Sequence, residues 1–231
     1  MTDRSLRIKP AIDWFRREGW TPRDFQVAAW HESLDGRDGL VVSPTGSGKT
    51  LAVAIGPMLE RLAESVPVDA DADADPLRVL WITPLRALAA DTTRALKRAV
   101  DSLGIPWTVE QRTGDTSSSV KSRQKKRLPS VLVTTPESLA LLLTWSQTHD
   151  QIAGVRTVIC DEWHELLGSK RGSMLELTLA RVRGVAPEAR SWGLSATIGN
   201  IDVAAEVLSG GSRPTPRIVR DDTPKRIEVE T

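Results

Sequence analysis

The stretch GLVVSPTGSGKT, residues 39–50, decides the expected fold of the chain. It opens with the apolar run GLVV, whose paired valines favour a short buried strand. The glycine-rich stretch SPTGSGKT, residues 43–50, follows, and apolar residues at three- and four-residue spacing then continue to residue 65, as in a helix. A strand, a loop ending in Gly-Lys-Thr and a helix, in that order, predict a loop that cradles phosphates.

The residue types of this loop suit phosphate binding. Gly46 and Gly48 lack a Cβ, so the backbone can curl and point its amides at phosphate oxygens. Lys49 can place its ammonium on the β- and γ-phosphates, and the Thr50 hydroxyl can bind Mg²⁺ at the helix N-terminus. Ser43 replaces the usual opening glycine, which weakens the match to the general pattern but leaves the cradle. The predicted nucleotide contacts are Thr45, Gly46, Ser47, Gly48, Lys49 and Thr50.

Apolar, β-branched runs recur along the chain and alternate with helix-like stretches. The runs lie at residues 78–83, 131–135, 155–160 and 191–197, and helix-like stretches include residues 50–65 and 86–103. This alternation predicts an α/β fold with a mostly parallel central sheet and helices on both faces. Such sheets bind ligands in the loops beyond the carboxyl ends of their strands, so we expect the chemistry there.

Two adjacent acids, Asp161 and Glu162, follow the run VRTVIC. Taken alone, such a pair is more often a solvated turn, but phosphoryl transfer needs both a phosphate loop and carboxylates of this kind. We therefore assign Asp161 to Mg²⁺ and Glu162 to the water that attacks the γ-phosphate. His164 either hydrogen-bonds toward this site or toward residues 195–197, or has a purely structural role. Cys160 has no further cysteines with which to build a zinc site, so we expect it in the core.

The composition restricts the class of protein. Charged residues make up 26% of the chain and nearly cancel to a net charge of +1, so any nucleic-acid site must be local. A single cysteine excludes an internal disulfide and fits a reducing cytoplasm. No apolar run approaches the roughly 18 residues of a spanning helix, and the N-terminus has no signal-peptide pattern. We expect a cytoplasmic protein without a membrane partner.

Two stretches are predicted to be surface insertions. Residues 67–76, PVDADADADP, hold no core-forming side chains and predict a solvated, mobile loop. Residues 117–129, SSSVKSRQKKRLP, are basic and of helical character. That second stretch is either a solvated helix face or a patch that faces phosphates, and the sequence leaves both interpretations open.

Several short motifs occur in an order typical of one enzyme family. They are GWTPRDFQ (19–26), SPTGSGKT (43–50), PLRAL (84–88), TGD (113–115), TTPESL (134–139), DEWH (161–164) and SAT (195–197). With these motifs the chain resembles the DExH-box helicases of superfamily 2 over nearly its whole length. The stretches GWTPRDFQVAAW, RTGDTSSS, DEWHEL and GLSATIGN are most similar to the large helicase-related (Lhr) group, and within it to the ligase-associated DNA repair branch.

The resemblance implies a fold and a nucleotide. Residues 1–220 would form the first RecA-like domain of a P-loop NTPase, and residues 221–231 would begin the linker to a second RecA-like lobe that is not part of this chain. Gln26, with Arg23 nearby, would recognise the adenine of ATP through its side-chain amide. Phe15 or Trp14 would stack on the base, although burial of these large rings in the core is an open alternative.

The resemblance also implies a nucleic-acid strand and partners. Arg86, Gly114 and Thr135 would contact the phosphate backbone without recognising sequence, and Ser195 and Thr197 would couple the nucleotide site to the strand. The chain would then be the motor lobe of an ATP-dependent helicase that moves on single-stranded DNA in repair, associated with a DNA ligase and a nuclease. Without the arginines of the second lobe, it would bind ATP and hydrolyse it very slowly.

Other classes of protein remain as alternatives. An RNA helicase lobe is one, because contacts to the backbone do not distinguish DNA from RNA unless a 2′-hydroxyl is recognised. A kinase or transport ATPase could share the phosphate loop, but PLRAL and TTPESL favour a helicase. A nucleotide-gated, non-catalytic module that binds a partner is a third, against which the full set of catalytic residue types argues.

Overall fold

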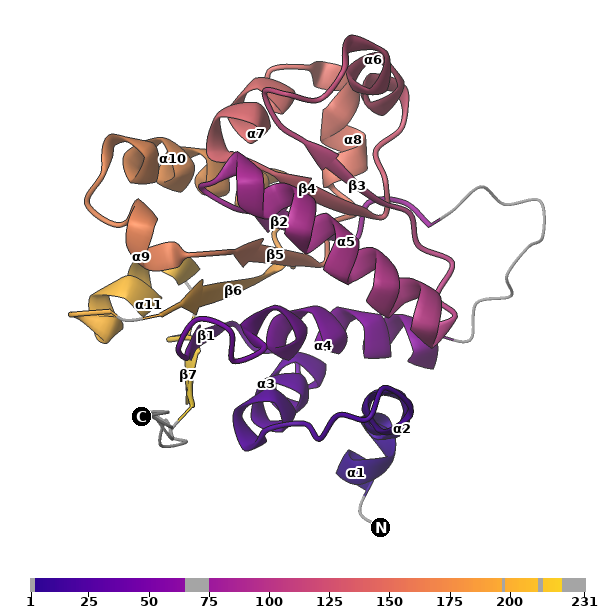
Figure 1. The fold of residues 1–231 in the computed structure, drawn as a ribbon. Coiled ribbons are helices and arrows are strands. Elements are labelled where there is room, and N and C mark those ends of the chain that lie inside the picture. Colours follow the sequence, from indigo (N-terminus) through magenta and orange to yellow (C-terminus); the bar gives the residue numbers. More distant parts are fainter. Residues whose placement is uncertain (1–2, 65–74, 197, 212–213, 222–231) are drawn as a thin grey trace, which may run out of the picture.

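The computed structural model describes residues 3–64, 75–196, 198–211 and 214–221. These residues contain one sheet of seven strands in the order β3-β4-β2-β5-β6-β1-β7, with every neighbouring pair parallel (Figure 1). The strands are β1 (Gly39–Val42), β2 (Val79–Ile82), β3 (Val109–Arg112), β4 (Val131–Thr134), β5 (Thr157–Cys160), β6 (Arg190–Ser195) and β7 (Arg217–Arg220).

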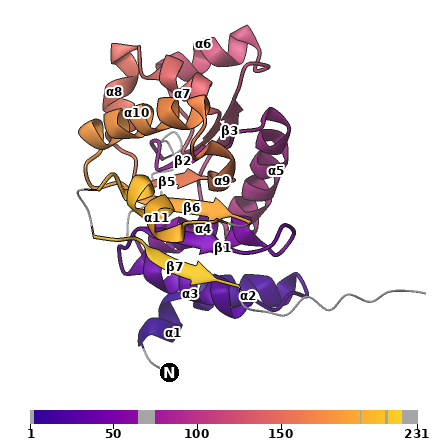
Figure 2. The same cartoon turned by 90° about the vertical axis from the view of Figure 1, so that its left-hand side faces the viewer.

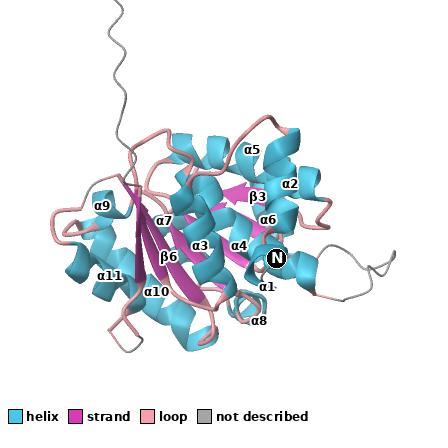
Figure 3. Cartoon of the chain, turned by 90° about the horizontal axis from the view of Figure 1, so that it is seen from below, coloured by secondary structure: helices cyan, strands magenta, loops and turns pink. Residues whose placement is uncertain are grey.

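Helices cover both faces of this sheet. On one face lie α2 (Lys9–Arg17), α3 (Asp24–Leu34), α4 (Lys49–Ala63) and α5 (Arg86–Leu103), preceded by the short α1 (Asp3–Arg7). On the other lie α7 (Pro136–Leu142), α8 (His149–Ile152), α9 (Trp163–Leu166), α10 (Lys170–Val185) and α11 (Ile201–Ser209). Helix α6 (Ser118–Lys126) lies beside the β3 edge and contacts η1 (Ser146–Thr148). Figure 2 shows the sheet between α5 and α10, and Figure 3 shows it between α3 and α11.

The strands are buried on both faces, which explains their continuous apolar sequence. Along β2, Trp81 packs into the hydrophobic cluster under α2 to α5, whereas Leu80 and Ile82 pack into the cluster under α7 to α11. Each of these three side chains is 0% exposed. Burying a large apolar side chain contributes roughly 1.5–3 kcal/mol, so the two layers of core hold the helices to the sheet.

The predicted fold class is confirmed, and so are the five predicted strands, whose bounds differ from the structure by no more than two residues. Strands β3 and β7, which form the two edges of the sheet, are not among the predicted strands. Edge strands need less apolar sequence because one side has no neighbour, and β3 reads VEQR while β7 reads RIVR. No helix among the described residues has the length and apolarity that crossing a membrane requires.

The predicted acidic loop lies mostly outside the described residues, as do residues 222–231 of the predicted linker. Asp75, near the end of the loop, is not solvated as predicted. Its carboxylate accepts hydrogen bonds from Nε1 of Trp107, at 2.8 Å, and from Nε of Arg61. The prediction of a free surface loop is therefore wrong at Asp75, because the core supplies donors that the loop sequence does not reveal.

Parallel strands bring every strand's carboxyl end to the same edge of the sheet. The loops after β5, β6, β1 and β7 lie together on one half of that edge, and those after β3, β4 and β2 lie on the other half. Along the sequence, the loops after β2, β3 and β4 come between the loop after β1 and the loops after β5, β6 and β7. The order of strands in the sheet is what sorts them into two groups. The two halves form the two sites described next.

Candidate nucleotide site and nucleic-acid groove

The phosphate loop connects the end of β1 to the start of α4. Gly46 and Gly48 have positive φ angles of 80° and 92°, a conformation that favours glycine. Gly48 precedes α4 as its N-cap, and a Cβ at this position would lie 2.6 Å from Nε2 of Gln26. The loop therefore curls in the way the sequence predicts, with the N-terminus of α4 directed at its centre.

Lys49 and Asp161 are charged groups buried at this site. Each is 8% exposed, and Nζ of Lys49 is buried with no hydrogen-bond partner. Burial raises the pKa of Asp161 to about 6, and the neighbouring charge of Glu162 adds to the rise. Hydrogen bonds from Nε1 of Trp81, at 3.3 Å, and from the Glu162 backbone N–H, at 2.9 Å, oppose it, as does the charge of Lys49. An ammonium without a partner and a desolvated carboxylate fit a ligand that carries both phosphates and a cation.

The carboxylates after β5 are held in an unusual backbone conformation. Glu162 has φ 45° and is the single residue other than glycine with positive φ among those the structure describes. Strain of this kind concentrates at functional sites. Within the same described residues, no group of three or more acidic, histidine or cysteine side chains could hold a metal ion. A magnesium ion at Thr50 and Asp161 would take further ligands from nucleotide phosphates and water, as magnesium does at sites of this kind.

Strand β6 lies between β5 and β1, so it connects the phosphate loop after β1 with the loop of Asp161 and Glu162 after β5. Oγ of Ser195, at the end of β6, lies 3.0 Å from Nδ1 of His164. The Ser195 carbonyl accepts a hydrogen bond from the backbone N–H of Ser43, in the phosphate loop, at 3.0 Å. His164 therefore contacts the motif at residues 195–197, which is one of the contacts predicted for it. Thr197, the last residue of that motif, lies outside the described residues.

The predicted adenine-binding residues lie beside the phosphate loop. Oε1 of Gln26 accepts from the backbone N–H of Arg23 at 2.9 Å, and Nε2 donates to the Gly48 carbonyl at 3.1 Å. Trp14 and Phe15 are 1% and 3% exposed and pack edge to face against each other. These rings belong to the core, so the expectation that one of them stacks on the base is wrong. Rings of this size contribute most when fully buried.

Sequence reasoning missed two polar groups that support the loop. Oγ of Ser43 lies 2.6 Å from Oγ of Ser47 and 2.9 Å from Oδ2 of Asp221, just after β7. The same carboxylate pairs with the Arg23 guanidinium at 3.2 Å. Serine in place of the usual glycine at position 43 is the one sequence feature that could have indicated a polar contact here. Nothing in the sequence places Asp221 next to it.

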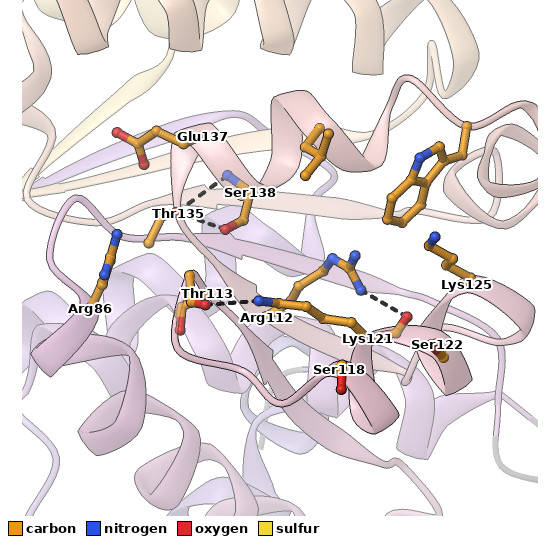
Figure 4. Close-up of a pocket in the computed structure, with 13 residues that line it drawn as sticks. Arg86, Arg112, Thr113, Ser118, Lys121, Ser122, Lys125, Thr135, Glu137 and Ser138 are labelled. Carbon is orange, nitrogen blue, oxygen red and sulfur yellow. Dashed lines mark hydrogen bonds between the residues drawn. The ribbon is translucent and has the colours of Figure 1, made fainter.

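The other half of the sheet edge carries a groove of about 460 Å³ (Figure 4). Its lining includes all three predicted nucleic-acid contacts: Arg86, Gly114 and Thr135. Arg86 pairs with Asp115 at 3.0 Å, and its guanidinium lies so close to Gly114 that a Cβ there would meet it at 2.8 Å. Thr135 caps α7, its hydroxyl accepting from the Ser138 N–H at 3.4 Å. The loops after β2, β3 and β4 thus bring these three residues to one surface.

Comparison with known proteins identifies the family. The model of the DEAD/DEAH box helicase family matches residues 23–204, a span that contains both the phosphate loop and the DEWH motif. The chain belongs to the DEAD/DEAH box helicases. This helicase domain is 36% identical over 214 residues to "Lhr helicase/uracil glycosylase" of Escherichia coli, an alignment that covers 87% of the chain and 14% of the relative.

Two further relatives of this helicase domain support the Lhr resemblance. The "ATP-dependent helicase Lhr-Core" of Methanocaldococcus jannaschii is 37% identical over 232 residues, covering 96% of the chain and 27% of that protein. The structure of Mycobacterium smegmatis helicase Lhr bound to ssDNA and AMP-PNP superposes with a TM-score of 0.76 at 36% identity, covering 94% of the chain and 28% of that structure. The similarity to the Lhr group is confirmed, whereas the ligase-associated branch stays a prediction. The chain spans less than a third of each of these relatives.

Proposed function

We propose that this helicase domain binds ATP with Mg²⁺ and, together with a second RecA-like lobe, couples ATP hydrolysis to movement along single-stranded DNA. The observation that carries the proposal is the buried Lys49 ammonium, which has no partner at the centre of a curled phosphate loop. Leaving such a group unpaired costs several kcal/mol of desolvation, so the site favours binding of a polyphosphate.

Each residue of the site has a chemical role in this proposal. Lys49 stabilises charge on the β- and γ-phosphates, and Thr50 and Asp161 hold the magnesium ion, which neutralises phosphate charge when it is bound. Glu162 orients the attacking water and accepts its proton. His164 lies 3.6 Å from Glu162 and 3.0 Å from Ser195, so it can transmit a change at the carboxylate to β6. Gln26 and Arg23 recognise the adenine.

The nucleic-acid strand is proposed to lie along the groove of Arg86, Gly114 and Thr135. These residues offer a guanidinium, a backbone amide and a hydroxyl, which suit phosphates and not bases. The Mycobacterium smegmatis relative was solved with ssDNA, which favours DNA over RNA for this chain. A role in DNA repair, association with a DNA ligase and a nuclease, and a cytoplasmic location belong to the same proposal, through the ligase-associated resemblance.

A second lobe is proposed to supply the arginines that reach the γ-phosphate from across the cleft. An arginine of this kind contributes about three to five powers of ten in rate, so this domain alone is expected to bind ATP and hydrolyse it very slowly. Ser195 and Thr197 would couple the nucleotide state to the strand. Ser195 is suited to this role because it already contacts both catalytic loops.

Calorimetry with MgATP tests the nucleotide assignment. The unaltered chain should bind, Lys49→Ala should lose binding, and the exposed Lys97→Ala should bind like the unaltered chain, since it removes the same charge away from the site. Undiminished affinity in Lys49→Ala would reject the phosphate-loop assignment.

Fluorescence anisotropy with labelled DNA and RNA of equal sequence, with and without AMP-PNP, then tests whether the domain binds a nucleic-acid strand. Tight MgATP binding without any nucleic-acid binding would favour the partner-binding module instead.

A further inference from the structure

Arg112 is a buried cation without a carboxylate partner. It ends β3, is 3% exposed and lines the groove. Its NH1 group donates only to neutral acceptors, the Lys121 carbonyl and Oε1 of Gln124, both at 3.2 Å. Burial lowers the pKa of its guanidinium, since no charge among the described residues offsets the loss of water. A buried charge left in this state favours an anion in the groove.

The carboxylates around Arg112 are already paired with other residues. Glu110, two residues earlier on the same side of β3, binds Arg123 at 2.7 Å. Glu137, which lines the groove, binds Arg171 at 2.6 Å. These two carboxylates therefore pair with other cations, and among the described residues no ion pair to Arg112 is formed.

A second cation lies on the same aromatic ring as Arg112. Cζ of Arg112 is 4.8 Å and Nζ of Lys125 is 4.2 Å from the ring centre of Trp145. Each cation is attracted to the ring, but two like charges held at one ring repel each other. An anion close to both cations would relieve the repulsion. Lys121 does not take part, because its Nζ donates to the Gly114 carbonyl at 2.8 Å.

Helix α6 presents one face to the groove. The groove is lined by Ser118, Lys121, Ser122 and Lys125, whose spacing of three and four residues places them on one side of the helix. Arg123 points to Glu110 instead, and Lys126 is exposed outside the groove. The basic stretch that the sequence left ambiguous therefore has a groove face and a solvated face.

We propose that Arg112 and Lys125, held around Trp145, form a phosphate subsite that extends the nucleic-acid strand from Arg86 and Thr135 toward α6. The proposal rests on the proposed function, because the subsite is continuous with that groove. The chemistry favours a strand over an acidic peptide because the same cavity holds the backbone-binding residues. Leu141, 55% exposed in the groove wall, offers an apolar surface against which a base can lie.

Anisotropy titrations of this chain with labelled oligothymidylates of increasing length, in the presence of AMP-PNP, test the subsite. Lys125→Gln should weaken binding by about fivefold at 0.1 M salt and reduce the slope of log affinity against log salt by about 0.7. The loss should appear only with oligonucleotides long enough to reach α6. Lys126→Gln, with the same charge change on the same helix, should bind like the unaltered chain. Because Arg112 is buried, Arg112→Gln serves as a second variant only if its melting curve remains cooperative.

The outcomes separate this inference from the proposed function. If Arg86→Ala weakens DNA binding while Lys125→Gln and Lys126→Gln behave alike, the subsite is rejected and the proposed function stands. If the unaltered chain binds no single strand at any length, both are rejected. If Lys125→Gln impairs binding of polyglutamate but not of DNA, the groove is a peptide site and the inference is wrong.

Discussion

Replacing Asp161 with asparagine is expected to stabilise the nucleotide-free domain. Burial raises the pKa of this carboxyl from 3.8 to about 6, so its ionised form costs the folded state about 3 kcal/mol above pH 6. The carboxylate accepts from Trp81 and from the Glu162 backbone, and asparagine can accept only one of these bonds. Losing one bond costs about 1 kcal/mol, which leaves a net gain of about 2 kcal/mol.

The contribution of Asp161 to the free energy of unfolding depends on pH with a definite sign. The unfolded chain releases the Asp161 proton near pH 3.8 and the folded chain near pH 6. Between these two pH values the folded state therefore holds more protons than the unfolded state. The contribution of this group to stability therefore falls as pH rises through that window. The advantage of Asp161→Asn over the unaltered chain should be near zero at about pH 4.5, where the lost hydrogen bond offsets the ionisation cost, and complete above about pH 6.5.

Thermal unfolding in EDTA, followed by circular dichroism at about pH 4.5 and about pH 8, measures this difference. At the higher pH, Asp161→Asn should melt about 4–8 °C above the unaltered chain, given about 2–4 °C per kcal/mol for a domain of this size. The exposed Asp101→Asn should show a smaller and nearly pH-independent change. A variant that melts at or below the unaltered chain at pH 8 would show that Asp161 is not desolvated, and the argument for a cation site would fail with it.

Three further substitutions test other parts of the site. Glu162→Gln should keep MgATP affinity in calorimetry but abolish hydrolysis once the second lobe is present, and unchanged turnover would remove Glu162 from catalysis. Gln26→Ala should narrow the preference for ATP over GTP, and an unchanged preference would move adenine recognition elsewhere. Ser43→Gly should lower the melting temperature by about 2–4 °C, since it loses a buried hydrogen bond worth about 1 kcal/mol, while MgATP affinity stays within about twofold. An unaltered melting curve would mean that the bonds from Ser43 to Ser47 and Asp221 contribute nothing to stability.

The central strands and the phosphate loop were predictable because local sequence determines them. A parallel strand buried on both faces must be a short apolar run, and a loop with φ angles of 80° and 92° must place glycine at those positions. The edges were not predictable in this way. β3 carries Glu110 and Arg112, whose partners come from α6 and not from the strand itself. Such residues look like loop sequence until the neighbouring helix is in place.

Contacts between strands explain what remained hidden in the site. Trp81 on β2 donates to Asp161 after β5, and the pairing of Ile82 with Cys160 sets this contact. A shift of one residue in that register would turn the Trp81 ring to the other face of the sheet and remove the bond. Trp81 therefore joins Asp161, the proposed magnesium ligand, to the strand that leads to Arg86 in the groove. The strand order that separates the two sites also places β2 beside β5, so the Asp161 carboxylate contacts a side chain of a strand whose following loop lines the groove.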